Sequence, residues 1–152
     1  MRIQLTVSEP NIPGYFWASP QNTELKNPDQ FYNIWEYCME GQATEIYAPS
    51  ILEIFKVTDL EQIIPEWAKL LAGGGKLILG GTDFYILARE GIRRAKDLGM
   101  LNEILFNKPH SIQSLTSVES TRKFLESLNF GINKINIDHE NFGYTVEGIK
   151  ND

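Results

Sequence analysis

The chain has 152 residues, of which 42% are hydrophobic and 22% are charged, and its formal net charge at pH 7 is -6. This length and composition predict one globular domain over residues 1–152, with enough apolar material for a core. The negative charge and the even scatter of lysine and arginine argue against a nucleic-acid-binding protein, which needs a basic face to meet the phosphates.

The cysteine count and the hydropathy pattern bear on the compartment. The chain has one cysteine, Cys38, which excludes an internal disulfide bond and favours a reducing environment. No apolar run approaches the roughly 20 residues that a membrane-spanning helix needs, and Arg2 is followed by a strand pattern rather than by a signal-peptide core. We therefore expect a cytoplasmic protein without a membrane anchor.

Strands and loops are predicted in the first part of the chain. Alternating apolar residues predict a strand over 2–7, and the aromatic stretch at 15–19 predicts a second strand after a proline-glycine turn. The polar stretch 19–30 contains two prolines and predicts a surface loop. A weaker strand, or a strand followed by a helical turn, is expected over 31–38.

The middle of the chain alternates strands with a helix. A strand is expected over 43–50, and the apolar run "KLILGG" at 76–81 predicts the central strand of a parallel sheet, buried on both faces. Between the two strands, Thr58 or Asp59 is expected to cap a helix that carries apolar residues at helical spacing. The glycines at 73–75 are expected to end this helix.

Pro65 interrupts the apolar pattern of the same helix. A proline in a helix interior removes one backbone hydrogen bond and clashes with the preceding turn. We therefore expect the regular helix to begin near Pro65, with 59–64 forming a looser first turn.

Helices and a β-hairpin are predicted towards the C-terminus. Residues 83–99 predict a helix that stops at its last glycine, followed by the helical piece "MLNEILF", and 117–131 carry a later helical stripe. Alternating runs at 132–138 and 143–149 predict a terminal hairpin. The order of elements predicts an α/β sheet of parallel character with an antiparallel edge.

The stretch "ATEIYAPSILEIFKVTDLEQIIPEWAKLLAGGGKLILGG" at 43–81 resembles the second half of the class I S-adenosylmethionine-dependent methyltransferase fold. "SVESTRKFLESLNFGINKINID" at 117–138 is similar to that family's late helix and strand. The resemblance implies a Rossmann-like, mostly parallel sheet with an antiparallel C-terminal hairpin strand, helices on both faces and a reduced N-terminus. The residues that carry the first match are Glu45-Ile46-Tyr47-Ala48, Leu52-Glu53, Trp67, Leu70-Leu71 and Gly74-Gly75-Lys76-Leu77.

The start of the chain is similar to the family's first cofactor loop, "L-G-C-G-D-x-x-x-P-G-Y-x-N-V-D". The loop glycines fall on Thr6 and Ser8, the terminal aspartate falls on Ser19, and Glu9 stands at the acidic position. Glycine serves in such loops because the backbone approaches the ligand closely, and an aspartate accepts charge-assisted bonds from the ribose. The replacements predict S-adenosylmethionine binding weakened by several decades, since each 1.4 kcal/mol is about tenfold. The matching residues are Leu5 and Pro13-Gly14-Tyr15.

Further site residues follow from the resemblance and from the rule that open α/β sheets bind ligands at the carboxyl ends of their strands. Asn33 is expected on the adenine and ribose side of the cofactor. The loop after the fourth strand of the family, Ala48, Pro49 and Ser50, is expected to contact cofactor and substrate.

Two residues are candidates for catalysis, each with a simpler alternative. His110, in a loop that often closes over the family's active site, would suit a general base because a histidine pKa lies near neutrality, or it is a solvated loop residue. Asp83 would border the pocket, or it is a structural helix cap. The two histidines and one cysteine have no metal-ligand spacing, so no metal site is expected.

Three functions remain open on the sequence alone. The first is an S-adenosylmethionine-dependent methyltransferase with a diverged cofactor loop and a small-molecule or glycan acceptor. The second is a non-catalytic methyltransferase-like module that no longer binds S-adenosylmethionine and acts as a homodimer or as the partner of an active methyltransferase. The third is an unrelated nucleotide- or sugar-binding α/β protein. Fold alone does not choose among them.

Overall fold

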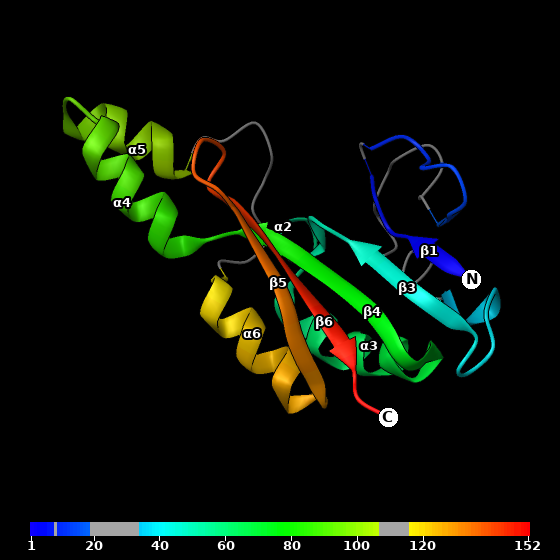
Figure 1. The fold of residues 1–152 in the computed structure, drawn as a ribbon. Helices are drawn as coiled ribbons and strands as arrows, with labels where there is room; N and C mark the ends of the chain where they lie inside the picture. Colours follow the sequence, from blue (N-terminus) through cyan, green and yellow to red (C-terminus); the bar gives the residue numbers. More distant parts are fainter. Residues whose placement is uncertain (8, 19–33, 107–115) are drawn as a thin grey trace.

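The computed structural model describes residues 1–7, 9–18, 34–106 and 116–152 (Figure 1). These residues form a six-stranded sheet in the order β2-β1-β3-β4-β6-β5. The strands β1 to β4 pair in parallel, and β6 is antiparallel to both β4 and β5, which confirms the predicted mostly parallel sheet with a C-terminal hairpin. The strands are β1 Arg2–Gln4, β2 Phe16–Trp17, β3 Ala43–Ala48, β4 Leu71–Thr82, β5 Phe130–Asp138 and β6 Gly143–Lys150.

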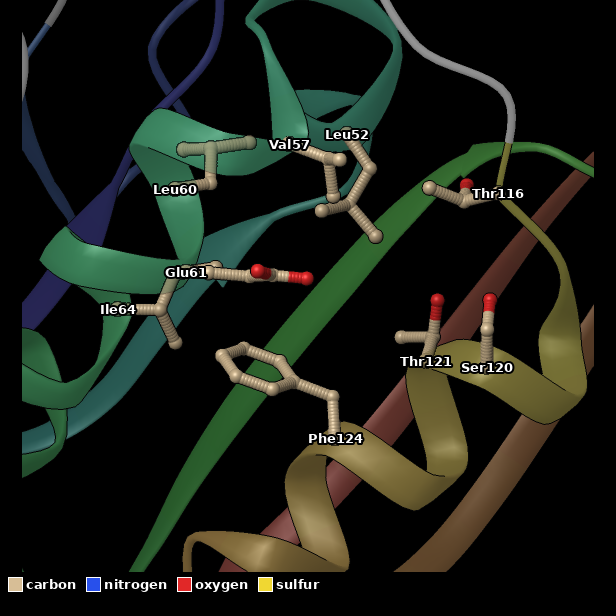
Figure 2. A pocket seen from close by; sticks show the side chains of 9 residues that line it. All are labelled: Leu52, Val57, Leu60, Glu61, Ile64, Thr116, Ser120, Thr121 and Phe124. Atoms are coloured by element: carbon tan, nitrogen blue, oxygen red, sulfur yellow. The ribbon is translucent and has the colours of Figure 1, made fainter.

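The helices that cover the sheet, α2, α3 and α6, lie on one of its faces. Side chains from all three line a common pocket, and Figure 2 shows α3 and α6 facing each other beside β4. We expected helices on both faces of the sheet, and among the described residues α2, α3 and α6 cover this face. The helical segments are the 3-10 helix η1 Ile34–Glu36, α2 Ile51–Ile54, α3 Val57–Leu70, α4 Phe84–Arg94, α5 Leu98–Phe106 and α6 Val118–Ser127.

The core lies between the sheet and these helices. Ile46 of β3, Leu77 and Leu79 of β4, and Trp67 of α3 are fully buried there. Burial of a large apolar side chain stabilises the fold by about 1.5 to 3 kcal/mol, so this layer outweighs weak local preferences. The buried β4 has β3 on one side and β6 on the other, which confirms that it is a central strand.

Pro65 lies inside the regular helix α3, so the expected start of the helix near Pro65 is wrong. The helix begins at Val57, after Lys56, which makes no side-chain capping bond. The proline nitrogen cannot donate to the carbonyl of Glu61, one turn earlier. The burial of Ile64 and Trp67 on either side of the proline holds this turn helical at the expense of one backbone bond.

Three further boundaries differ from the sequence predictions. The helix α3 ends at Leu70 and the glycines at 73–75 lie inside β4. At this junction the ammonium of Lys150 donates to the carbonyls of Ala68 and Leu71 at 2.8 Å each. Gly99 lies inside α5 rather than at the end of the preceding helix. The described part of 31–38 contains the 3-10 helix η1 rather than a strand.

The last elements agree with their local patterns. Ser117 and Ser120 form a reciprocal capping box at the start of α6, with bonds of 3.0 and 2.9 Å. The helices α4 and α5 extend beyond the end of the sheet (Figure 1). They pack on the β5–β6 hairpin through a small second core of Ile86, Leu87 and Phe142.

Candidate functional site

A cleft of about 660 Å³ lies at the carboxyl ends of β3 and β4, beside the β5–β6 hairpin. In an open α/β sheet this edge is where ligands bind. Its walls come from segments far apart in the sequence. They are Glu9 of the first loop, Tyr47, Pro49, Ser50 and Glu53 around the end of β3, Gly81 of β4, and most of the hairpin residues 136–145.

Three of the predicted cofactor-binding residues, Glu9, Pro49 and Ser50, meet in this cleft. The side chain of Ala48 instead belongs to the core, with no exposed surface, and does not line the cleft. Thr6 is also buried and is absent from the lining. The other predicted site residues, Ser8, Ser19, Asn33 and His110, lie outside the described residues.

Gly80 allows the Pro49 loop to lie directly against β4. A Cβ atom at this position would overlap the carbonyl oxygen of Pro49 and would come within 2.5 Å of the carbonyl oxygen of Tyr144. A larger residue would push the Pro49 loop away from the strand. The glycine therefore sets the position of one wall of the cleft.

The first loop is held by hydrogen bonds among its own side chains. The Thr6 hydroxyl accepts bonds from the amide of Gln4 at 2.8 Å and from the indole nitrogen of Trp17 at 3.0 Å, and donates to the carbonyl of Glu9 at 3.2 Å. The fully buried Gln4 also donates to the carbonyl of Pro10 and accepts from the amide of Ile12. Thr6 thus organises the loop through its hydroxyl.

Glu9 and Tyr47 form a polar pair on the cleft wall. The Tyr47 hydroxyl donates to the Glu9 carboxylate. Burial raises the pKa of Tyr47, and the negative charge of Glu9 and its hydrogen bond raise it further, so the phenol stays protonated at neutral pH. We did not predict Tyr47 as a site residue from the sequence. The alternation of β3 was the signal for its position, because it turns Tyr47 away from the buried Ile46 and Ala48.

The face of the sheet that carries Tyr47 also carries a row of charged side chains, further from the cleft. The strand register pairs Arg2 with Glu45 and Glu45 with Lys76. Burial raises the pKa of Glu45, and the positive charges of Lys76 and Arg2 oppose this rise. The Tyr15 hydroxyl donates to the Glu45 carboxylate, and the Arg2 guanidinium lies 4.8 Å from the centre of the Tyr15 ring.

Asp83 caps two helices and does not line the cleft. One carboxylate oxygen accepts from the amide of Ile86 in α4 at 2.9 Å, and the other accepts from the amide of Val118 in α6 at 2.8 Å. Only 4% of Asp83 is exposed. Of the two interpretations that the sequence left open, this geometry matches the structural cap.

A second, smaller pocket of about 60 Å³ lies between α2, α3 and α6 (Figure 2). It is largely apolar, with Leu60, Ile64 and Phe124 on its walls, and the Glu61 side chain extends across it. The hydroxyl of the buried Tyr144 lies 2.6 Å from both Thr116 and Thr121, which border this pocket. Tyr144 is also among the residues that line the cleft.

Among residues 1–7, 9–18, 34–106 and 116–152, no group of three or more His, Cys, Asp and Glu side chains is placed to hold a metal ion. None of the helices in these segments has the length and apolarity to span a bilayer.

The fold is similar to solved methyltransferase structures. Magnesium protoporphyrin IX methyltransferase (ChlM) from Synechocystis PCC 6803, with bound SAH, is 17% identical, covers 74% of this chain and 47% of its own, and has a TM-score of 0.50. A SAM-dependent methyltransferase from Archaeoglobus fulgidus is 10% identical over 78% of this chain and 64% of its own, with a TM-score of 0.55. One from Methanosarcina mazei is 14% identical over 75% and 62%, with a TM-score of 0.52.

No family model and no curated protein matches the sequence. The chain spans 47% to 64% of the length of these three solved structures. At such identities the likeness establishes the fold and leaves the reaction to be tested. The strand order, the antiparallel hairpin and these structures agree on one conclusion. The chain has the fold of the class I S-adenosylmethionine-dependent methyltransferases.

Proposed function

We propose that this chain is an S-adenosylmethionine-dependent methyltransferase that acts on a small-molecule or glycan acceptor. The observation that carries the proposal is the position of the cleft, at the carboxyl ends of β3 and β4 in a class I methyltransferase fold. The solved structure that holds SAH supports the choice of cofactor.

The described residues fit the cofactor on one side of the site. Glu9 offers a carboxylate and Ser50 a hydroxyl in the cleft, and both suit the amino and hydroxyl groups of S-adenosylmethionine. When bound, this cofactor supplies a methyl group on a positively charged sulfur. The role of the protein would be to hold the acceptor in line with that methyl group, and the Pro49 loop, which lies directly against Gly80, would contribute to that alignment.

The residues of the first loop fit S-adenosylmethionine less well. Thr6 has a side chain where the resembled family has glycine, and its hydroxyl is engaged by Gln4 and Trp17. This observation favours the second candidate, a methyltransferase-like module that no longer binds S-adenosylmethionine. Such a module would act as a homodimer or with an active methyltransferase.

Calorimetric titration with S-adenosylmethionine and S-adenosylhomocysteine separates the two candidates. A methyltransferase should bind both with micromolar dissociation constants, which correspond to about -8 kcal/mol. No heat and no shift of the melting temperature at millimolar ligand would contradict the methyltransferase proposal and leave the binding module.

A second experiment restores the glycines and the aspartate of the resembled family and tests whether the first loop alone blocks the cofactor. If the loop replacements alone block the cofactor, the triple variant Thr6→Gly, Ser8→Gly and Ser19→Asp should gain affinity by at least one decade. Thr58→Gly, at an exposed position on α3, is the control for a general effect of adding glycine. Circular dichroism before each titration establishes that the variant is folded.

A further inference from the structure

The strand β5 forms one edge of the sheet in the part of the chain that the structure describes (Figure 1). Among these residues only β6 pairs with it, and every side chain from Asn133 to Asp138 is exposed. At nine residues β5 is longer than most strands, and it contains no proline. The free backbone groups of such an edge can pair with a further strand.

One face of β5 is apolar. Ile135 and Ile137 lie opposite Val146 and Tyr144 of β6, which are buried in the core, yet 38% of Ile135 and 47% of Ile137 are exposed. The two isoleucines thus extend the apolar face of the sheet onto its last strand. A further strand beside β5 would cover both of them.

The opposite face of β5 carries Lys134 and Asp138. A hydrogen bond from the side chain of Asn141 lowers the pKa of Asp138, so this carboxylate is ionised at neutral pH. Lys134 forms no ion pair with the described residues, and Glu147, which lies opposite it in β6, pairs with Lys76 at 3.8 Å. The edge therefore presents one positive and one negative charge on the same face.

These features become complementary when β5 pairs with the same strand of a second copy. In an antiparallel pair alternate residues turn their backbone groups towards the partner strand, so only an alignment that matches these residues with each other can form. Centred on Asn136, the pairing places Lys134 opposite Asp138 of the second copy and Ile135 opposite Ile137 of the second copy. The two-fold axis repeats each contact. Within β5, a pairing centred on Ile135 or on Ile137 does not bring Lys134 opposite a carboxylate.

We propose that β5 pairs with β5 of a second copy of this chain about a two-fold axis at Asn136, which gives a dimer with one continuous sheet. Opposite charges and branched apolar side chains that lie directly across a strand pair each stabilise it. The dimer also bears on the cleft, because Asn136, Ile137 and Asp138 line it. Lys134 of the second copy adds a positive charge beside Asp138, where the described lining residues include no lysine, arginine or histidine. This pairing does not depend on the proposed methyltransferase activity.

Sedimentation velocity at protein concentrations from about 10 µM to about 1 mM measures the association. A single strand pair buries less surface than a standard interface, so we expect a weak dimer with a dissociation constant on the order of 100 µM at low ionic strength. A chain that stays monomeric at about 1 mM overturns the proposal. The same monomer is expected if the edge instead pairs with a strand of another protein.

A charge-reversing variant tests the contact across the axis. Lys134→Glu places a carboxylate opposite Asp138 of the second copy and should weaken the association by about tenfold or more. Lys96→Glu, at an exposed position between α4 and α5, changes the net charge equally and should leave the dissociation constant unchanged. Circular dichroism establishes that both variants are folded. Equal effects of the two variants would overturn the proposal.

Disulfide formation tests the alignment of the two strands. Asn136→Cys puts its thiol opposite the same thiol of the second copy, and the Cα atoms of directly opposite residues lie about 4.5 to 5.5 Å apart, which a disulfide can span. Mild oxidation should therefore give a covalent dimer. Ile135→Cys, which faces Ile137 of the second copy, should cross-link much more slowly, and the wild type, whose one cysteine is the buried Cys38, should not cross-link. Cross-linking of Ile135→Cys as fast as that of Asn136→Cys would overturn the proposed pairing.

Discussion

The indole nitrogen of Trp17 donates a hydrogen bond of 3.0 Å to the hydroxyl of Thr6, and this bond joins the loop after β1 to β2. The amide of Gln4 donates to the same hydroxyl at 2.8 Å. The first loop is therefore stabilised by its own side chains.

Replacing Thr6 by valine should destabilise the protein. The variant keeps the shape of the side chain and leaves the buried amide of Gln4 and the indole of Trp17 each without one acceptor. We expect the free energy of unfolding to fall by roughly 1 to 3 kcal/mol. Urea denaturation measures the change, with Thr58→Val at an exposed position as the control. Equal stability of the two variants would show that the Thr6 bonds do not hold the loop.

The two hydrogen bonds that Asp83 accepts predict that two substitutions at this position lower the stability by different amounts. Asp83→Ala removes the acceptors of the Ile86 and Val118 amides and should cost more than one ordinary helix cap, which is worth about 1 kcal/mol. Asp83→Asn keeps one oxygen and should cost less. Thermal unfolding ranks the two, and Asp59→Ala, at the exposed start of α3, is the control. An alanine variant as stable as the asparagine variant would contradict the double cap.

Gly80 and Gly99 should respond in opposite directions to alanine. Gly80→Ala would place a methyl group against the carbonyls of Pro49 and Tyr144, so we expect a loss of several kcal/mol or failure to fold. Gly99 lies in α5 with only an ordinary contact of 3.4 Å to Asp97, so Gly99→Ala should stabilise the protein by about 0.5 to 1 kcal/mol. Chemical denaturation of both variants, compared with the wild type, measures the two effects.

The hydroxyl of Tyr144 predicts a pH-dependent contribution to stability. Burial raises the pKa of Tyr144 above its ordinary value of 10.0, and the bonds to Thr116 and Thr121 only partly oppose the rise. The folded chain therefore keeps the phenolic proton to higher pH than the unfolded chain does. The contribution is fully present below the unfolded pKa and is lost as the pH rises through the folded pKa.

Tyr144→Phe should therefore lower the free energy of unfolding by roughly 1 to 3 kcal/mol at neutral pH, because two buried threonine hydroxyls lose a partner. Above pH about 10 the gap between wild type and variant should narrow, since only the wild type has this proton to lose. Urea denaturation at several pH values measures the gap. A gap that widens with pH would contradict the sign of the shift.

The sequence predicted well those elements whose signal is local. The strand patterns of β3, β5 and β6 and the helical stripe of α6 each lie within about ten residues. The local pattern gave the wrong start for α3. Pro65 by itself indicates a helix start, and only the burial of its neighbours Ile64 and Trp67 shows why the helix runs through it.

The candidate site was predicted in part, for a related reason. Glu9, Pro49 and Ser50 follow predicted strands, and the carboxyl ends of parallel strands meet at one edge, so a rule about sheets was enough to place them. Tyr47 needed the strand register, which decides the face of the sheet to which its side chain points. The wall that the β5–β6 hairpin forms could be placed only from the order of all six strands in the sheet.

By itself, the sequence determined the α/β class, the order of the main elements and the resemblance to a methyltransferase fold. Only the tertiary structure decided that Thr6 accepts hydrogen bonds from Gln4 and Trp17 and that Asp83 joins two helices. It also decided that residues as far apart in the sequence as Glu9 and Glu140 line one cleft. The physical reason is distance along the chain. Periodicity and capping act between close neighbours, whereas a cleft and a buried hydrogen-bond network join residues that only strand pairing and core packing bring together.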